Sequence, residues 1–269
     1  MRTVAVVLAG GSGRRFGGSM PKQLQPLAGH TLVEHCVAAF DRAPDVDEVL
    51  VVTAAEFADQ IAGQLRRYGK LTGIVAGGSA RSDSTRQAIA AIGSATATGS
   101  AVGPGSGSAA DLASAAGSVD AAGTVTADCN VLFHDAARPL VDQRIIADCV
   151  TALRTWQAIG VVVPSADTIV EVSDGVLGRV LPRDSLARCQ TPQGFRLSVI
   201  SRAYQLAAAD PGFAAISATD DCGVVRRYLP DVPIGAVPGS EHNIKITYPA
   251  DLAVAETLLA QLSGPAPAC

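Results

Sequence analysis

Glycines and basic residues lie close together near the N-terminus of the sequence. The segment LAGGSGRRF, from Leu8 to Phe16, begins at the end of the apolar stretch VAVVLA, and Pro21-Lys22-Gln23 comes shortly after it. Glycines after a strand let the backbone approach an anion closely and point its N–H groups toward it. Cations beside such a loop suit a triphosphate that becomes more negative as it is attacked. The segment therefore predicts a phosphate site.

Two well-known phosphate motifs do not fit this loop. The dinucleotide pattern G-x-G-x-x-G would start at Gly11 and meets Phe16 where its third glycine belongs. The P-loop pattern would start at Gly13 and reach Gly18, but Ser19 then stands where lysine is required. A glycine-rich turn with solvated arginines is the alternative that this segment alone leaves open.

A second candidate group lies in the segment VLFHDAARP, from Val131 to Pro139. A strand that ends in Asp135 places a carboxylate at the carboxyl edge of a sheet, where ligands bind in open α/β folds. A lone carboxylate suits Mg²⁺, which takes one or two protein oxygens besides waters and substrate phosphates. Arg138 could bind a second anion, whereas His134 points to the opposite strand face as a core group. An aspartate that only caps the next turn is the alternative.

Short apolar runs alternate with amphipathic stretches along the chain, as in β-α units around a mainly parallel sheet. Thr31 and Glu34 form a capping box that predicts where the first helix starts. We expect one α/β domain over residues 1–269. Strands are predicted at 4–9, 48–53, 73–75, 130–134, 160–163, 233–237 and 244–246, and helices at 31–40, 54–68, 84–92, 143–153, 197–208 and 249–262.

Residues 168–180 read TIVEVSDGVLGRV, two β-rich segments around Asp174-Gly175, and predict a hairpin within an arm at 165–186. A hairpin that leaves an α/β core cannot bury both of its faces there. We therefore expect it to pack on a partner subunit.

The composition collapses to Gly, Ala, Ser and Thr over residues 93–126. Such a stretch has almost no large apolar side chain to offset its ordering entropy. It predicts a flexible surface insertion that the chemistry does not need.

The whole chain has a net charge of −4 with 17% charged residues, so neither a nucleic-acid surface nor a membrane surface is indicated. No apolar run reaches the roughly 20 residues of a membrane span, and the start lacks a signal-peptide cleavage pattern. The six cysteines are scattered without zinc spacing. We expect reduced thiols in a cytoplasmic protein.

Five motifs occur together and in a fixed order: the loop LAGGSGRRF with Pro21-Lys22-Gln23, HDAARP at 134–139, Thr191-Pro192-Gln193, Thr219-Asp220, and NIKIT at 243–247. In this the chain resembles the 2-C-methyl-D-erythritol 4-phosphate cytidylyltransferases of non-mevalonate isoprenoid biosynthesis. The resemblance implies a Rossmann-like α/β fold of the nucleotide-diphospho-sugar transferase type, with a single mainly parallel sheet flanked by helices. It also implies a homodimer with an exchanged β-arm, CTP and a polyol phosphate as substrates, and Mg²⁺ as cofactor.

The resemblance also implies roles for residues at matching positions. Arg15, Lys22 and Lys245 would stabilise the reacting phosphates, and Asp135 would hold the metal. The nucleotide would lie against Ala9, Gly10, Gly11, Gly13, Gly78 and Ser84. The sugar phosphate would lie against Arg138, Thr168, Arg183, Thr191 and Thr219, with Arg183 reaching into the neighbouring subunit. One departure is Ser79, where many relatives carry an acidic residue.

The implied reaction is CTP + 2-C-methyl-D-erythritol 4-phosphate giving 4-diphosphocytidyl-2-C-methyl-D-erythritol and pyrophosphate. The substrate phosphate is already an anionic nucleophile, so no general base is required. A cytidylyltransferase for another polyol phosphate, such as ribitol 5-phosphate, is the nearest alternative, and a non-catalytic nucleotide-binding module is another. Structural roles stay open for Thr168, Thr191 and Arg183.

Overall fold

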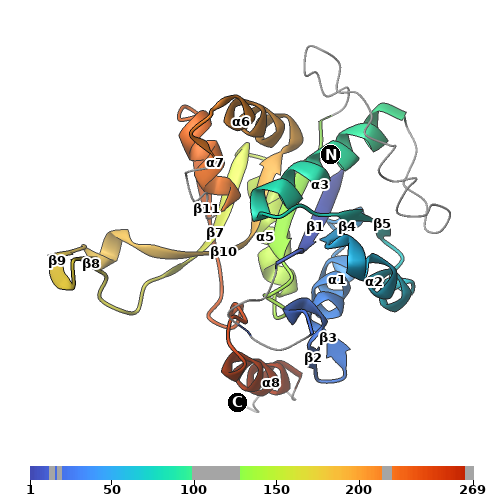
Figure 1. Cartoon of the computed structure of the whole chain (residues 1–269), viewed down its shortest axis with the longest axis horizontal. Coiled ribbons are helices and arrows are strands. Elements are labelled where there is room, and N and C mark those ends of the chain that lie inside the picture. The colour runs from blue at the N-terminus through green and yellow to red at the C-terminus, as the bar shows by residue number, and fades with distance from the viewer. Residues whose placement is uncertain (12–15, 17–19, 99–127, 214–219, 264–269) are drawn as a thin grey trace.

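A single seven-stranded sheet runs through the body of the protein (Figure 1). The structure is a computed structural model that describes residues 1–11, 16, 20–98, 128–213 and 220–263. The strand order is β11-β7-β10-β6-β1-β4-β5, and β10 alone among these strands runs antiparallel to its neighbours. The predicted mainly parallel α/β sheet is therefore confirmed. The strands are β1 (Thr3–Ala9), β4 (Glu48–Thr53), β5 (Leu71–Ala76), β6 (Asn130–Asp135), β7 (Ala158–Pro164), β10 (Ala187–Arg196) and β11 (Ile234–Pro238).

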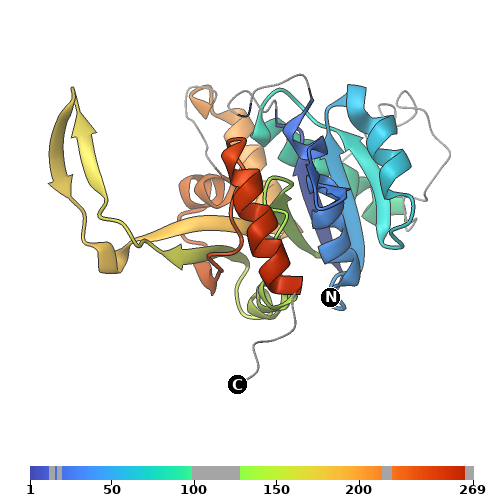
Figure 2. The ribbon, with the colours of Figure 1, turned by 90° about the horizontal axis from the view of Figure 1, so that it is seen from below.

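Helices cover both faces of this sheet and bury them in two separate cores (Figures 1 and 2). In β1, Ala5 and Val7 face the core under α1, α2 and α5, whereas Val4 and Val6 face the core under α3, α6 and α7. This two-sided burial explains why β1 is apolar at successive positions. The helices are α1 (Leu32–Arg42), α2 (Ala58–Leu65), α3 (Arg81–Thr98), α5 (Gln143–Ala152), α6 (Leu197–Ala209), α7 (Asp221–Tyr228) and α8 (Ala250–Ser263), with short 3-10 turns η1 (Lys22–Leu24), η2 (Ala55–Phe57) and η3 (Arg183–Ser185).

The capping box predicted for the first helix is confirmed. The Thr31 hydroxyl accepts from the backbone N–H of Glu34, and the Glu34 carboxylate accepts from the backbone N–H of Thr31 at 2.8 Å. These two bonds satisfy N–H groups that a helix start otherwise leaves unpaired. They fix α1 directly after the small two-stranded sheet β2 (Pro26–Leu27) and β3 (His30–Thr31).

Four elements differ from the sequence-based expectations. Residues 244–246, predicted as a strand, are irregular, because Ile246 packs in a third core with Phe16, Leu27 and α8 and donates its N–H to Ala137. The helix predicted at 84–92 is α3, which starts earlier and continues to Thr98, into the predicted insertion. Small residues such as alanine and serine keep adequate helix propensity even where they bury little. The rest of the predicted insertion, after Thr98, lies outside the described residues. β10 and α7 have no counterpart among the predicted elements.

The predicted hairpin is confirmed as β8 (Val170–Ser173) and β9 (Val176–Val180), joined through Asp174 and Gly175, which both have positive φ. It projects from the body at the left of Figures 1 and 2. Its large apolar side chains are exposed in the single chain: Val172, Val176, Leu177 and Val180. Within the described ranges, no helix combines the length and the apolar character needed to cross a membrane.

Candidate functional site

Asp135 lies at the carboxyl edge of the sheet, beside the start of the glycine loop. Its Cα pairs with that of Leu8 in the parallel register of β6 and β1, and the next N–H, that of Ala136, donates to the Leu8 carbonyl at 3.0 Å. The neighbouring connection after β5 is tied to the same edge, since the N–H of Gly77 donates to the Thr53 carbonyl at 2.7 Å. The carboxyl ends of four neighbouring strands, β6, β1, β4 and β5, therefore bring the glycine loop, the Gly77 segment and Asp135 to the same edge, as ligand sites in open α/β sheets require.

Two cations contact the Asp135 carboxylate. Lys245 Nζ lies 2.7 Å from Oδ2, and Arg81 Nε lies 3.4 Å from Oδ1, while the Asp135 side chain is only 14% exposed. Burial acts to raise the pKa of Asp135, but the charges of Arg81 and Lys245 outweigh it and hold the pKa well below its usual range. Asp135 is therefore a carboxylate at neutral pH, and Asp135 and Lys245, each predicted separately as a site residue, are in direct contact.

A buried hydrogen-bond chain supports Asp135 from behind. The Thr191 hydroxyl accepts from the Asp135 N–H at 3.1 Å and lies 3.1 Å from Nδ1 of His134, whose Nε2 lies 3.0 Å from the Arg138 carbonyl. This pattern places the imidazole proton on Nε2, where a carbonyl accepts it, and leaves Nδ1 to accept from Thr191. His134 is fully buried, as its expected core role requires. The Thr191 hydroxyl is thus already used within the protein.

His134 makes the stability of the protein fall in mild acid. Burial lowers its pKa from 6.5 to about 4, so between these values the unfolded chain takes up a proton that the folded chain refuses. Stability is fully present above pH 6.5 and declines as the pH falls toward 4, by about 3 kcal/mol at most. Urea denaturation at a series of pH values should show this decline, and His134→Gln, less stable at neutral pH, should show a shallower one. An equal slope in both proteins would contradict the assignment.

The guanidinium of Arg138 binds backbone carbonyls. Nη1 donates to the Asn243 carbonyl at 2.7 Å and Nη2 to that of Cys189 at 3.3 Å, while the buried Nε has no acceptor among the described residues. Asn243 in turn donates from Nδ2 to the Thr191 carbonyl at 2.9 Å. Arg138 therefore fixes the segment that carries Lys245 against β10. Its role toward the sugar phosphate stays a prediction.

Ser84 lies in a notch formed by Gly10, which was predicted to bind the nucleotide, and by Gly77. A Cβ on Gly10 would lie 3.1 Å from Ser84 Oγ, and a Cβ on Gly77 would lie 2.7 Å from it. Gly78 is tighter still, because a Cβ there would lie 2.2 Å from Cβ of Asp83. Ala9 ends the adjacent strand β1 and is buried. The structure thus brings Ala9, Gly10, Gly78 and Ser84 together at one corner of the sheet edge.

Ser79, the departure from many relatives, contacts the same corner. Its hydroxyl donates to Asp83 Oδ2 at 3.1 Å, and the N–H of Ala80 donates to the same oxygen at 3.1 Å. Asp83 therefore closes the turn that leads into α3. The carboxylate in this turn is that of Asp83, and the Ser79 hydroxyl donates a hydrogen bond to it.

Gly78→Ala is expected to lower both stability and nucleotide affinity. The added methyl would overlap Cβ of Asp83, an atom fixed by the backbone, so the turn must shift at a cost of about 1–3 kcal/mol. Nucleotide binding should weaken as well, because Gly78 is one of the residues predicted to line the nucleotide site. Gly93→Ala is the matched control, because its Cβ would meet no atom within 4 Å and lies in α3. Urea midpoints that are equal for the two variants would contradict this account.

The remaining predicted residues lie in or just after the glycine loop, at the root of the arm, or outside the described residues. Gly11 is exposed in the loop and Lys22 is half-buried in η1, whereas Arg15, Gly13 and Thr219 lie outside the described residues. Thr168 and Arg183 are exposed at the root of the arm, where Arg183 Nη1 lies 3.4 Å from the Ala166 carbonyl. The described contacts do not join them to Asp135 within one chain.

Sequence reasoning missed Arg81 and Asp221. Arg81 Nη1 donates to Asp221 Oδ2 at 2.6 Å, so this arginine lies between Asp221 and Asp135. The sequence places each of them only within or beside a recognised motif: Arg81 lies in GGSARSDS, and Asp221 follows Thr219-Asp220. Nothing in their spacing indicates that they meet.

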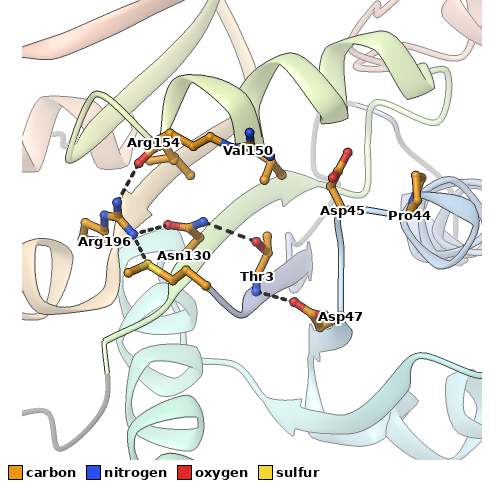
Figure 3. Close-up of a pocket in the computed structure, with 10 residues that line it drawn as sticks. Thr3, Pro44, Asp45, Asp47, Asn130, Val150, Arg154 and Arg196 are labelled. Atoms are coloured by element: carbon orange, nitrogen blue, oxygen red, sulfur yellow. Dashed lines mark hydrogen bonds between the residues drawn. The ribbon is translucent and has the colours of Figure 1, made fainter.

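A hollow of about 300 Å³ lies at the other end of the sheet, where β1 and β6 begin and β10 ends (Figure 3). Met1, Thr3, Asn130 and Arg196 line it, and Figure 3 shows Arg196 pointing to Asn130. It contains none of the predicted site residues.

The donor set at Asp135 suits a metal that arrives with the substrate. Among the described residues there is no group of three or more His, Cys, Asp or Glu side chains that could hold a metal alone. Mg²⁺ is commonly bound through one or two carboxylates together with substrate phosphates and waters. One hard carboxylate beside the predicted phosphate loop therefore fits Mg²⁺.

Comparisons with known proteins decide the family. The sequence profile described as 2-C-methyl-D-erythritol 4-phosphate cytidylyltransferase matches residues 3–99 and 114–261. A protein of that name from Thermobifida fusca is 47% identical over 266 residues, which cover 96% of this chain and 93% of the relative. The chain belongs to this family. The resemblance inferred from the motifs is confirmed, and the gap in the profile match falls within the predicted insertion.

A further sequence relative and two solved structures are also similar to this cytidylyltransferase family member. The bifunctional ribulose 5-phosphate reductase/CDP-ribitol pyrophosphorylase of Haemophilus influenzae is 32% identical over 96% of this chain and 48% of its own length. The 4-diphosphocytidyl-2C-methyl-D-erythritol synthase structure from Anaerococcus prevotii has a TM-score of 0.72 at 23% identity, covering 96% of this chain and 98% of that one. The Thermus thermophilus 2-C-methyl-D-erythritol 4-phosphate cytidylyltransferase structure, at 26% identity and the same coverage, has a TM-score of 0.66.

Proposed function

We propose that this chain transfers CMP from CTP to 2-C-methyl-D-erythritol 4-phosphate, giving 4-diphosphocytidyl-2-C-methyl-D-erythritol and pyrophosphate. The observation that carries the proposal is the contact of Lys245 with Asp135 beside the glycine loop, in a chain that belongs to this family. A phosphate oxygen of the acceptor attacks the α-phosphorus of CTP, a new P–O bond forms, and the bond to the β-phosphate oxygen breaks. The chain is therefore a nucleotidyltransferase enzyme of non-mevalonate isoprenoid biosynthesis.

The residues of the site supply charge stabilisation without proton transfer. His134, the imidazole nearest to Asp135 along the chain, is buried, uncharged at neutral pH and hydrogen-bonded on both nitrogens, so it cannot serve as a general base. The acceptor phosphate needs none, because it is already an anion. Two such anions at about 4 Å repel each other by several kcal/mol at intermediate effective dielectric. Arg15, Lys22 and Lys245 would offset this repulsion.

Mg²⁺ is part of the proposal, with Asp135 as its protein ligand. A bound Mg²⁺ would supply Lewis-acid stabilisation of phosphate charge. The chain's own contribution is the carboxylate, which Lys245 and Arg81 keep ionised.

A homodimer in the cytoplasm is the second part of the proposal. The exposed valines and leucine of β8 and β9 form an apolar surface on a thin hairpin, and such a surface calls for a partner. The arm would place Arg183 and Thr168 at the site of the partner subunit. The described cysteines, Cys36, Cys129, Cys149, Cys189 and Cys222, are all free thiols, as the cytoplasmic compartment favours.

Ribitol 5-phosphate is a second candidate acceptor, favoured by the similarity to the Haemophilus influenzae relative whose name includes CDP-ribitol pyrophosphorylase. We expect methylerythritol phosphate to be preferred, because the 47% identical relative carries that name.

Pyrophosphate release with Mg²⁺ tests the proposal across CTP, UTP and ATP, each combined with methylerythritol phosphate and with ribitol 5-phosphate. We expect turnover with CTP and methylerythritol phosphate. Turnover with ribitol 5-phosphate alone would overturn the acceptor. CTP binding without release in any combination would favour the non-catalytic alternative.

A further inference from the structure

We propose that Arg81 is a positioning residue for Asp135 and that the buried carboxylate of Asp221 holds Arg81 in that role. The proposal rests on the proposed function, since both concern the same carboxylate.

Arg81 connects three elements that are distant in the sequence. It is the first residue of α3, and its guanidinium reaches Asp135 at the end of β6 through Nε and Asp221 at the start of α7 through Nη1, at 3.4 and 2.6 Å. Its side chain is 24% exposed, so the guanidinium lies at the boundary of the site and the interior. Arginine suits this place because its planar group can serve two carboxylates at once.

Asp221 is a rigid support for this arginine. It is fully buried, and its Oδ1 accepts from the Tyr204 hydroxyl at 2.7 Å and from the Thr85 hydroxyl at 3.0 Å. Its backbone N–H donates to Gln193 Oε1 at 3.0 Å. A buried carboxylate needs a cation, since an uncompensated buried charge is strongly destabilising. The ion pair of Asp221 with Arg81 should therefore persist when ligands bind at Asp135.

Lys245, the other cation on Asp135, is held far less firmly. Its side chain is 43% exposed, it belongs to an irregular segment, and Asp135 is its ion-pair partner in the described part of the chain. Lys245 can therefore leave Asp135 for a phosphate oxygen at little cost. Arg81 stays, so Oδ1 of Asp135 remains restrained and partly compensated while Oδ2 becomes available.

One buried atom of Arg81 supports a positioning role over a purely structural one. Nη2 has no hydrogen-bond acceptor among the described residues. An unsatisfied buried donor costs about 1–3 kcal/mol, and such groups in native proteins call for an explanation. If the guanidinium served stability alone, Nη2 would be expected to have an acceptor. A guanidinium oriented so that Nε contacts Asp135 leaves Nη2 without one.

Steady-state kinetics of Arg81→Gln form the first test. We expect kcat to fall about 100-fold, as for a misplaced charge-stabilising group, with the KM for CTP changed less than about threefold. Arg81→Lys should recover part of kcat because it restores the charge without the second contact. Arg86→Gln, an exposed arginine of the same helix, is the matched control and should behave as wild type. A kcat within threefold of wild type for Arg81→Gln would overturn the proposal.

Binding of Mn²⁺ in the presence of a non-hydrolysable CTP analogue, followed by electron paramagnetic resonance, is the second test and needs no turnover. Arg81→Gln removes a competing cation, so Mn²⁺ should bind up to about tenfold more tightly. Asp221→Asn frees Arg81 to pair more strongly with Asp135, so Mn²⁺ should bind about tenfold more weakly. Equal affinities in wild type and Arg81→Gln would contradict the proposal, even if Asp221→Asn fails to fold.

The two tests separate this inference from the proposed function. If the wild-type chain transfers nothing from CTP to either acceptor, the proposed function fails, while the Mn²⁺ affinities still test whether Arg81 acts on Asp135. If wild type turns over and Arg81→Gln turns over equally, only the inference fails.

Discussion

Asp135→Asn is expected to lower kcat by roughly 10³-fold or more, the largest effect of any single substitution in the described site. The change removes the negative charge that faces Lys245 at 2.7 Å and Arg81 at 3.4 Å. The amide would also place a donor or a weaker acceptor against the lysine ammonium. Arg81 would keep Asp221 as its partner, so the fold should survive.

Pyrophosphate release measures this loss, and urea denaturation checks that the variant remains folded. Asp148→Asn is the matched control, because Asp148 is an exposed aspartate whose ion pair is with Arg144 on the same helix. A kcat for Asp135→Asn within tenfold of wild type would remove Asp135 from the machinery and, with it, the proposed metal ligand.

Activity regained by mixing two inactive variants is the second large effect that we expect. Arg183→Ala and Lys22→Ala should each lose turnover by roughly 10²-fold. If the arm carries Arg183 into the partner's site, a heterodimer of the two variants has one intact site. Random exchange of subunits then restores about a quarter of wild-type activity, because half of the dimers are mixed and each of these has one working site of two.

The mixing experiment needs proof that subunits exchange, which mass measurement of differently tagged chains provides. Leu177→Asp serves as a control for the arm itself: it places a charge on the exposed apolar hairpin and should leave a monomer of low activity. If the two variants exchange subunits and stay inactive, Arg183 acts within its own chain or not at all.

Local signals predicted the parts of the site that depend on one segment. Asp135 follows an apolar strand, Thr31 and Glu34 form their box within one turn, and Asp174-Gly175 supplies the positive φ values of a hairpin. In each case the physics acts between residues close in sequence. These elements were found with boundaries within a few residues of those in the structure.

The missed parts depend on contacts between distant segments. Arg81 and Asp221 are 140 residues apart, and only the packing of α3 against the start of α7 brings them together. β10 is antiparallel in an otherwise parallel sheet, and its Thr191-Pro192-Gln193 segment interrupts the regular pairing with β7. The alternation in Ile244-Lys245-Ile246 reflects packing against α8, which sequence alone does not distinguish from a strand.

The reversed direction of β10 also determines how the arm is attached. Ala187 on β10 pairs with Pro164 on β7, so everything between them is the connecting loop of one long hairpin. Such a loop can lengthen, shorten or change its sequence without altering the order or the handedness of the sheet. The proposed partner contact and the two arm residues proposed to reach the acceptor, Thr168 and Arg183, are therefore carried by one part of the chain, and the Asp135 corner by another. Exchanging residues 165–186 between relatives, with Thr168 and Arg183 kept, should redirect which chains assemble together while leaving the phosphate corner untouched.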